Sequence, residues 1–371
     1  MKGNNVLGII FANSKDESLR ELTGIRAFGS IPFGGKYRLI DFVLSNMVNS
    51  KIRKIGIVTK RNYQSLMDHL GSGKYWNLSK QRGGLSILPP FSEGNGNFDN
   101  KVKMLYEIKG FLERSKEEYV LISDCDVISN INYDEIIRNH IENEADITLI
   151  YKKALLPKKL VNPMVPLVNE DNRVIDIIIG TDYNNSCNFL LDMYLINKNL
   201  LIKLITDCIN SNRFDFRDDI IYSSVNKYNV FGYELIGESY IICSVDTYFD
   251  ANMALMSKDV RSKIFDKNRP IYTKVKDDMP ARYGGEAIIN NSLISNGCKI
   301  NGCVENSILF RGAEIKKGAK VSNCILMDND IIESNSDLSY VIADKNIKFG
   351  ENKSIRGLES FPIYINKSTV I

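Results

Sequence analysis

Short apolar runs alternate with longer amphipathic stretches over the first two-thirds of the chain. Lys36–Ser50 predicts a helix because its apolar residues recur at steps of three and four, and 62–70 predicts another. Alternating strands and helices predict an α/β fold with a mostly parallel sheet, which binds ligands beyond the carboxyl ends of its strands. Strands are expected at 6–11, 54–59, 119–123 and 147–151.

The last part of the chain has a different period. Ile288, Ile294 and Ile300 are six residues apart, and a second series with the same step begins at Leu309. A six-residue apolar step is typical of a parallel β-helix, whose coils stack only on their neighbours. A β-sandwich, the alternative, should alternate every two residues. A helix at 246–259 closes the first region, so we expect domains at 1–260 and 286–371 joined by a linker at 261–285.

Charge and cysteine content narrow the function classes. The 48 basic and 45 acidic residues give a net charge of +3, which argues against a general nucleic-acid binder. No apolar stretch approaches the roughly 18 residues needed to span a bilayer, and the N-terminus lacks a signal-peptide pattern. Seven scattered cysteines and two histidines favour reduced thiols over disulfides or zinc. We expect a cytoplasmic protein without a membrane or nucleic-acid partner.

Two acidic residues follow the third predicted strand. Asp124 and Asp126 are two residues apart on extended chain, so their carboxylates project to the same side. At the end of a parallel strand they can hold Mg²⁺. A turn with two solvated aspartates explains the same pattern equally well.

A glycine pair precedes the first predicted helix. Gly34 and Gly35 allow a tight turn, and Lys36 and Arg38 follow at the predicted start of the helix. Such a turn can meet an anion through helix N–H groups and side-chain charge. A plain helix-entry turn is the alternative.

Several long strings resemble the bacterial glucose-1-phosphate adenylyltransferases of glycogen synthesis. The resemblance covers nearly the whole chain and implies a dinucleotide-binding-like nucleotidyltransferase domain, a left-handed parallel β-helix and a tetramer. It also implies ATP and glucose 1-phosphate as substrates, with Mg²⁺. The strings are IPFGGKYRLIDFVLSNMVNSKI (31–52), SDCD (123–126), FDFRDDII (214–221), SVDTYFDAN (244–252) and RPIYTKVKDDMPARYG (269–284).

The phosphate-binding loop of that family is degenerate here. Its glycine-rich pattern, GGxGTRL, falls on residues 13–19, where every glycine and the arginine are replaced. Two acidic residues now stand where a triphosphate should lie, and like charges at about 4 Å cost roughly 4 kcal/mol at an effective dielectric of 20. The degenerate positions are Asn13, Ser14, Lys15, Asp16, Glu17 and Ser18.

Other family positions agree. Arg26 of the RAKP motif and the metal-binding Asp126 are retained, the latter as a weak residual site, and no counterpart of the GTADA segment is found. Asp246 lies two places beyond the second metal position and substitutes at best imperfectly. The lost positions are Phe28 for the RAKP lysine, Gly180 for the sugar-phosphate lysine and Ser244 for the second metal aspartate.

These losses resemble the non-catalytic GlgD-type subunits of the family. The resemblance implies a regulatory chain in a tetramer with a catalytic subunit that uses Mg²⁺, whereas no cofactor is expected for this chain. A sugar phosphate or nucleotide is the expected effector. Three alternatives remain: an active enzyme with a rearranged site, a ligand-free scaffold, and a β-helix acyltransferase, which the absence of histidines after His140 disfavours. The effector candidates are Arg26, Gly34, Gly35, Lys36 and Arg38.

Overall fold

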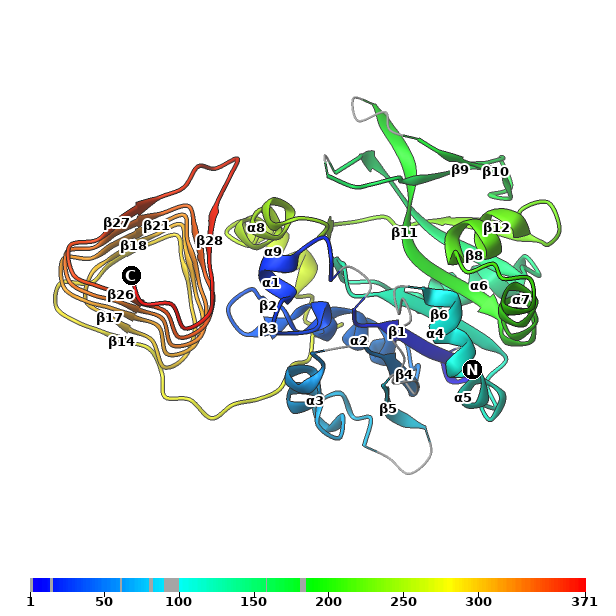
Figure 1. Cartoon of the computed structure of the whole chain (residues 1–371), viewed down its shortest axis with the longest axis horizontal. Coiled ribbons are helices and arrows are strands. Elements are labelled where there is room, and N and C mark those ends of the chain that lie inside the picture. Colours follow the sequence, from blue (N-terminus) through cyan, green and yellow to red (C-terminus); the bar gives the residue numbers. More distant parts are fainter. Residues whose placement is uncertain are drawn as a thin grey trace.

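An α/β domain and a β-helix lie beside each other in the computed structural model of the chain (Figure 1). In that view the coils of the β-helix are seen end on as a triangle, and helices α8 and α9 and the β2–β3 hairpin lie on the side of the α/β domain that faces it. The structure describes residues 3–13, 16–60, 62–79, 83–89, 100–157, 159–180 and 185–371.

The main sheet of the α/β domain has, among the described residues, seven strands in the order β12-β8-β11-β6-β1-β4-β5. Every neighbouring pair is parallel except those of β11, which runs antiparallel to both β6 and β8. The predicted mostly parallel sheet is therefore confirmed. Its strands are β1 (Val6–Phe11), β4 (Lys54–Val58), β5 (Gly84–Leu88), β6 (Tyr119–Asp124), β8 (Ile147–Leu155), β11 (Ser186–Asn197) and β12 (Val230–Glu234).

Helices cover both faces of this sheet, as the side chains of its central strand show. Leu7, Ile9 and Phe11 of β1 pack in one core cluster with α4, α5 and α7, whereas Val6 and Ile10 pack in another with α2. This two-residue alternation is the pleat of a strand that is buried on both sides. The helices are α1 (Arg20–Thr23), α2 (Leu39–Asn49), α3 (Gln64–Leu70), α4 (Lys101–Glu107), α5 (Lys109–Glu113), α6 (Tyr133–Glu142), α7 (Lys198–Asn210), α8 (Val245–Ala254) and α9 (Lys258–Ile264).

Short elements complete the domain. In the described part of the domain, three two-stranded ribbons lie outside the main sheet, formed by β2 with β3, β7 with β13 and β9 with β10. They comprise β2 (Pro32–Phe33), β3 (Tyr37–Arg38), β7 (Val127–Ser129), β9 (Met164–Val168), β10 (Val174–Ile179) and β13 (Ser239–Ile241). The 3₁₀ turns are η1 (Gly3–Asn5), η2 (Phe28–Ser30) and η3 (Lys74–Trp76), and η4 (Phe216–Tyr222) is a π-helix.

Two predicted helices need correction. The helix expected from Lys36 begins only at Leu39, because Gly34 and Gly35 adopt φ values of +57° and +87° and turn β2 back onto β3. Lys36 therefore lies in a hairpin turn instead of at a helix N-terminus. The single helix expected at 246–259 is two helices, α8 and α9, with a break between them.

The C-terminal part is the predicted left-handed parallel β-helix. Its strands form three five-stranded parallel sheets, one on each face of the triangle. Aliphatic and aromatic side chains such as Ile300, Ile315, Ile332 and Phe349 stack in register inside the coil and are buried. The inner coils therefore bury their apolar positions against their neighbours, as the six-residue period requires, whereas Ile288 on the first coil is exposed.

The strands of the β-helix follow the chain from face to face. One face contains β14 (Arg282–Tyr283), β17 (Lys299–Ile300), β20 (Glu314–Ile315), β23 (Ile331–Ile332) and β26 (Lys348–Phe349). The second contains β15 (Ile288–Asn290), β18 (Cys303–Glu305), β21 (Lys320–Ser322), β24 (Asp337–Ser339) and β27 (Ser354–Arg356). The third contains β16 (Leu293–Ile294), β19 (Ile308–Leu309), β22 (Ile325–Leu326), β25 (Val341–Ala343) and β28 (Ile363–Ile365).

Regular structure extends into both ends of the predicted linker, since α9 ends at Ile264 and β14 begins at Arg282. Among the described residues, no helix combines the length and apolar character needed to cross a membrane.

Candidate functional site

The degenerate loop after β1 is closed by its own acidic residue. Asp16 accepts hydrogen bonds from Asn13 Nδ2 at 2.6 Å and from the Phe28 backbone N–H at 3.0 Å. Its backbone carbonyl accepts another from Thr23 Oγ1 at 2.6 Å. The Asp16 carboxylate thus accepts hydrogen bonds from N–H donors of the chain itself. Glu17 is exposed on the same loop, 3.8 Å from Arg20.

Other loop residues have local roles or lie outside the described part. The side-chain oxygen of Asn13 accepts a hydrogen bond from the Lys60 backbone N–H at 2.9 Å, which ties the loop to the end of β4. Ser18 is exposed. Ser14 and Lys15 lie outside the described residues.

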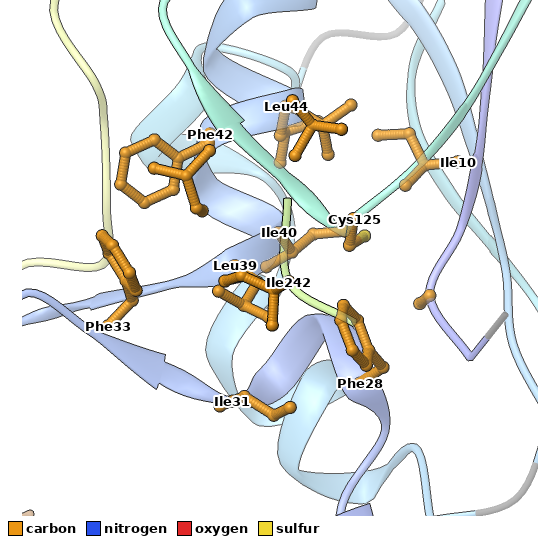
Figure 2. Packing of buried hydrophobic residues seen from close by; sticks show 14 of the residues in the cluster. Ile10, Phe28, Ile31, Phe33, Leu39, Ile40, Phe42, Leu44, Cys125 and Ile242 are labelled. Carbon is orange, nitrogen blue, oxygen red and sulfur yellow. The ribbon is translucent and has the colours of Figure 1, made fainter. Parts of the chain in front are cut away.

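The three lost positions hold no charge. Phe28 is fully buried and belongs to the core cluster of Figure 2, which also contains Ile31 and Ile242. Ser244 caps α8, where its Oγ accepts a hydrogen bond from the Thr247 N–H at 3.2 Å. Gly180 follows β10 and donates its N–H to the Pro163 carbonyl. The residues that replace the family's lysines and aspartate therefore stabilise the fold.

Three buried carboxylates meet at the carboxyl end of β6. Asp124, Asp126 and Asp192 each offer one oxygen, and these oxygens lie within 4.8 Å of one another. Asp192 lies at an irregularity of β11, where its φ of +52° departs from strand geometry. The sequence predicted that Asp124 and Asp126 share a side, but not Asp192. The one feature of the sequence that marks Asp192 is that it is a single charged residue inside the apolar run NFLLDMYLI (188–196).

Cations of the chain reach into this cluster. Lys101 Nζ lies 2.8 Å from Asp124 Oδ2, and Arg217 Nε lies 3.8 Å from Asp192 Oδ1. The Tyr194 hydroxyl donates to Asp192 Oδ1 at 2.8 Å, and burial raises the pKa of Tyr194, so it stays a protonated donor. Three carboxylates suit a hard divalent cation such as Mg²⁺. The Lys101 ammonium opposes the binding of such a cation, because it is already paired with an Asp124 oxygen that the cation would need as a ligand.

The residue expected to stand in for the second metal aspartate is also engaged. Asp246 lies on the first turn of α8 and forms an ion pair with Lys159. Ser244 caps the helix and has no carboxylate, and the carboxylate of Asp246 is already paired with a lysine. The start of α8 therefore offers no unpaired carboxylate to a metal ion at the end of β6.

A cationic cleft lies between the α/β domain and the β-helix, beside the apolar side chains through which the two pack together. Its larger chamber has a volume of about 370 Å³ and adjoins a smaller one of about 30 Å³, with Lys36, Tyr37 and Arg311 lining both. Tyr37 stacks on Phe265 with ring centroids 5.0 Å apart. The basic residues of the cleft are Lys36, Arg38, Arg261, Lys274, Lys276, Arg311 and Lys345.

Part of this charge is neutralised within the cleft. Lys345 lies 2.9 Å from Asp328, and Arg311 lies 3.4 Å from Asp278. Burial lowers the pKa of Lys345 even though Asp328 opposes this shift. The remaining excess of cations beside an aromatic pair suits an anionic ligand with a polar ring, such as a sugar phosphate or a nucleotide.

The structure separates the five effector candidates. Lys36 and Arg38 line the smaller chamber, and Gly34 lines the larger one. Gly35 accepts a hydrogen bond at its carbonyl from Ser295 Oγ of the β-helix at 2.9 Å. Arg26 lines neither chamber.

Arg26 instead forms a buried ion pair between the two domains. Its Nη2 lies 2.7 Å from both carboxylate oxygens of Asp344, and both side chains are at most 5% exposed. The Tyr364 hydroxyl donates to the same carboxylate at 2.6 Å. Sequence reasoning missed Asp344 because nothing local distinguishes it from the other aspartates of the β-helix.

Two family models match the chain. One, described as nucleotidyl transferase, matches residues 7–160, and the other, described as the GlmU-like C-terminal hexapeptide, matches residues 277–359. The first match lies within the α/β domain, and the second covers most of the β-helix.

Curated relatives match over most or all of the chain. Glycogen biosynthesis protein GlgD of Bacillus subtilis (strain 168) is 32% identical over 371 residues, which is 100% of this chain and 98% of that protein. GlgD of Geobacillus stearothermophilus is 36% identical over 321 residues, covering 86% of this chain and 83% of that protein. Glucose-1-phosphate adenylyltransferase of Clostridium perfringens (strain SM101 / Type A) is 31% identical over 385 residues, covering 100% and 98%.

Proposed function

Because this chain belongs to the family of the bacterial glucose-1-phosphate adenylyltransferases and GlgD proteins, we propose that it acts in glycogen biosynthesis as a regulatory subunit. In this proposal the chain itself has little or no adenylyltransferase activity. It assembles in the cytoplasm with a catalytic subunit, which forms ADP-glucose and diphosphate from ATP and glucose 1-phosphate with Mg²⁺.

The hydrogen bonds of Asp16 carry the proposal. Nucleotidyl transfer is catalysed mainly by positioning the phosphates and by stabilising their charge. In this loop a carboxylate accepts from Asn13 Nδ2 and from the Phe28 N–H, so donors that could meet a phosphate are taken by an anion of the chain. Loss of one such donor typically lowers the rate by about 10²–10³. Phe28, Gly180 and Ser244 add further losses.

The cleft between the domains supports a regulatory role. Lys36 and Arg38 come from the β2–β3 hairpin, and Arg311 and Lys345 come from the β-helix, so one anion can contact both bodies at once. A ligand changes an equilibrium between two arrangements only if it binds them unequally. A ligand held by both domains meets this condition, and the resulting bias would reach the catalytic subunit through their shared interface.

The direct test is an activity measurement on the purified chain. With ATP, glucose 1-phosphate and Mg²⁺, the chain alone should form ADP-glucose at no more than about 10⁻³ of the rate of a catalytic homologue, given the losses above. Mixed with that homologue, it should co-elute on size exclusion and change the effector response. Turnover by the chain alone at an ordinary enzyme rate would contradict the proposal and favour an active enzyme with a rearranged site.

The effector role is tested by anion binding to the purified chain. Glucose 1-phosphate, ATP and inorganic phosphate serve as calorimetric probes. Lys36→Ala should weaken binding of the best probe by at least about tenfold, because a charge-assisted hydrogen bond contributes about 1.5–3 kcal/mol. Lys317→Ala, which removes an exposed lysine of the β-helix paired with Glu286, is the matched control. If no probe binds, the chain is a ligand-free scaffold.

A further inference from the structure

We propose that Lys101 is a built-in counter-cation of the buried carboxylate cluster, so that its ammonium takes the place of a divalent cation. This inference deepens the proposed function, because it names a physical reason for the loss of catalysis. It concerns residues of α4, β6 and β11 that the degenerate loop does not include.

Lys101 is held at the cluster by the start of its helix. It is the first residue of α4, and the cap residue Asn100 accepts a hydrogen bond from the Val102 N–H at 3.1 Å. Its Nζ lies 5.4 Å from the ring centroid of Phe11 at the end of β1. The ammonium therefore lies between an aromatic face and a carboxylate, and its side chain is only 17% exposed.

The partner of Lys101 needs a cation. Asp124 is 1% exposed, and a buried carboxylate without an opposite charge is strongly unfavourable. Its Oδ2 receives Lys101 at 2.8 Å, whereas its Oδ1 is buried and has no hydrogen-bond partner within the described part of the chain. One oxygen of Asp124 is thus paired with the lysine, and the other is buried in the protein without a hydrogen-bond donor among the described residues.

A divalent cation at the carboxylate cluster would be repelled by the positive charge of Lys101. Asp126 and Asp192 complete the cluster, and Arg217 lies 3.8 Å from Asp192. A divalent cation bound to these oxygens would lie close to the Lys101 ammonium and would be repelled by it. Removal of the ammonium should therefore expose a latent divalent-cation site.

The test is Mn²⁺ binding to the full chain, followed by electron paramagnetic resonance and by the shift in melting temperature. Lys101→Met should bind Mn²⁺ at least about tenfold more tightly than the wild type, since one positive charge at a few ångströms is removed. Lys103→Met is the matched control. It lies on the same helix, but its ammonium faces the Phe214 ring, with 4.3 Å between Nζ and the ring centroid. This control should bind Mn²⁺ like the wild type.

The gained binding should disappear in the double variant Lys101→Met/Asp124→Asn. A folded Lys101→Met that binds Mn²⁺ no better than Lys103→Met would overturn the inference. If Lys101→Met does not fold, Mn²⁺ binding to the wild type is the deciding measurement. Binding that is abolished by Asp124→Asn would refute a built-in counter-cation. A wild type that does not bind Mn²⁺ would support one. None of these readouts involves turnover, so they are distinct from the activity test of the proposed function.

Discussion

Single carboxylates decide much of the chemistry of this chain. Asp16 replaces a family glycine, and from the sequence alone its charge would simply repel a triphosphate. The structure adds that the same carboxylate binds the chain's own donors, Asn13 Nδ2 and the Phe28 N–H. The sequence could not predict where the side chain of Asp16 points, since both donors are brought to it by tertiary structure.

Asp330 makes stability depend on pH. Burial, with Asp344 and Asp328 nearby, raises its pKa to about 9 from an ordinary value of 3.8. The folded state therefore holds a proton that the unfolded state releases between these values, so stability falls as the pH rises through this window. Between pH 5 and 8 the free energy of unfolding should fall by at least about 1 kcal/mol more for the wild type than for Asp330→Asn.

Urea denaturation at several pH values measures this difference. All other titrating groups are common to the two proteins, so they largely cancel. Parallel pH profiles of the two proteins would show that Asp330 is ionised in the folded state.

At the scale of elements, predictability followed the locality of the signal. The strands at 6–11 and 119–124 were predicted nearly to the residue, because each is built on a short local run of apolar residues. The long antiparallel strand β11 was not predicted, since Asp192 interrupts its apolar pattern. For the same reason the carboxylate cluster was only half predicted: Lys101 and Asp192 reach Asp124 from separate elements, and no local spacing encodes that meeting.

Asp41 joins two helices and should be important for stability. It is fully buried; its Oδ2 accepts from the Arg38 N–H at the start of α2, and its Oδ1 lies 2.6 Å from His69 Nε2 on α3. Asp41→Ala removes a cap, worth about 1 kcal/mol, and leaves a buried histidine without its partner, at about 1–3 kcal/mol. We expect a loss of about 2–4 kcal/mol in the free energy of unfolding, measured by urea denaturation.

Asp68→Ala is the control for this variant. Asp68 is exposed on α3, where its side chain accepts a surface hydrogen bond from Gln64, so its loss should cost no more than about 0.5 kcal/mol. Equal stability of the Asp41 and Asp68 variants would show that the junction of α2 and α3 does not depend on the buried carboxylate.

For the whole molecule, the junction between the two bodies combines apolar packing with buried polar contacts. Arg26 Nη2 donates to both carboxylate oxygens of Asp344, and Ser295 of the β-helix donates to the Gly35 carbonyl of the β2–β3 hairpin. Both contacts lie in the same region as the cationic cleft, so binding of an anion there and the relative placement of the domains are expected to be coupled.

Breaking the buried pair should destabilise the junction. Arg26→Met leaves Asp344 buried without its cation, which typically costs about 3–5 kcal/mol. The double variant Arg26→Met/Asp344→Asn should regain part of this loss, because no charge is left unpaired. Denaturant midpoints of the four proteins in the cycle measure the coupling. Additive effects of the two substitutions would mean that the pair contributes nothing to holding the domains together.

The Arg26–Asp344 pair also bears on the order of synthesis. The two residues are 318 positions apart, so at a translation rate of about 5–20 residues per second the arginine waits roughly 16–64 s for its partner. Throughout that interval Arg26 of the nascent α/β domain has no Asp344 carboxylate with which to pair. The junction between the two domains can therefore reach its final packing only after nearly all of the β-helix has left the ribosome.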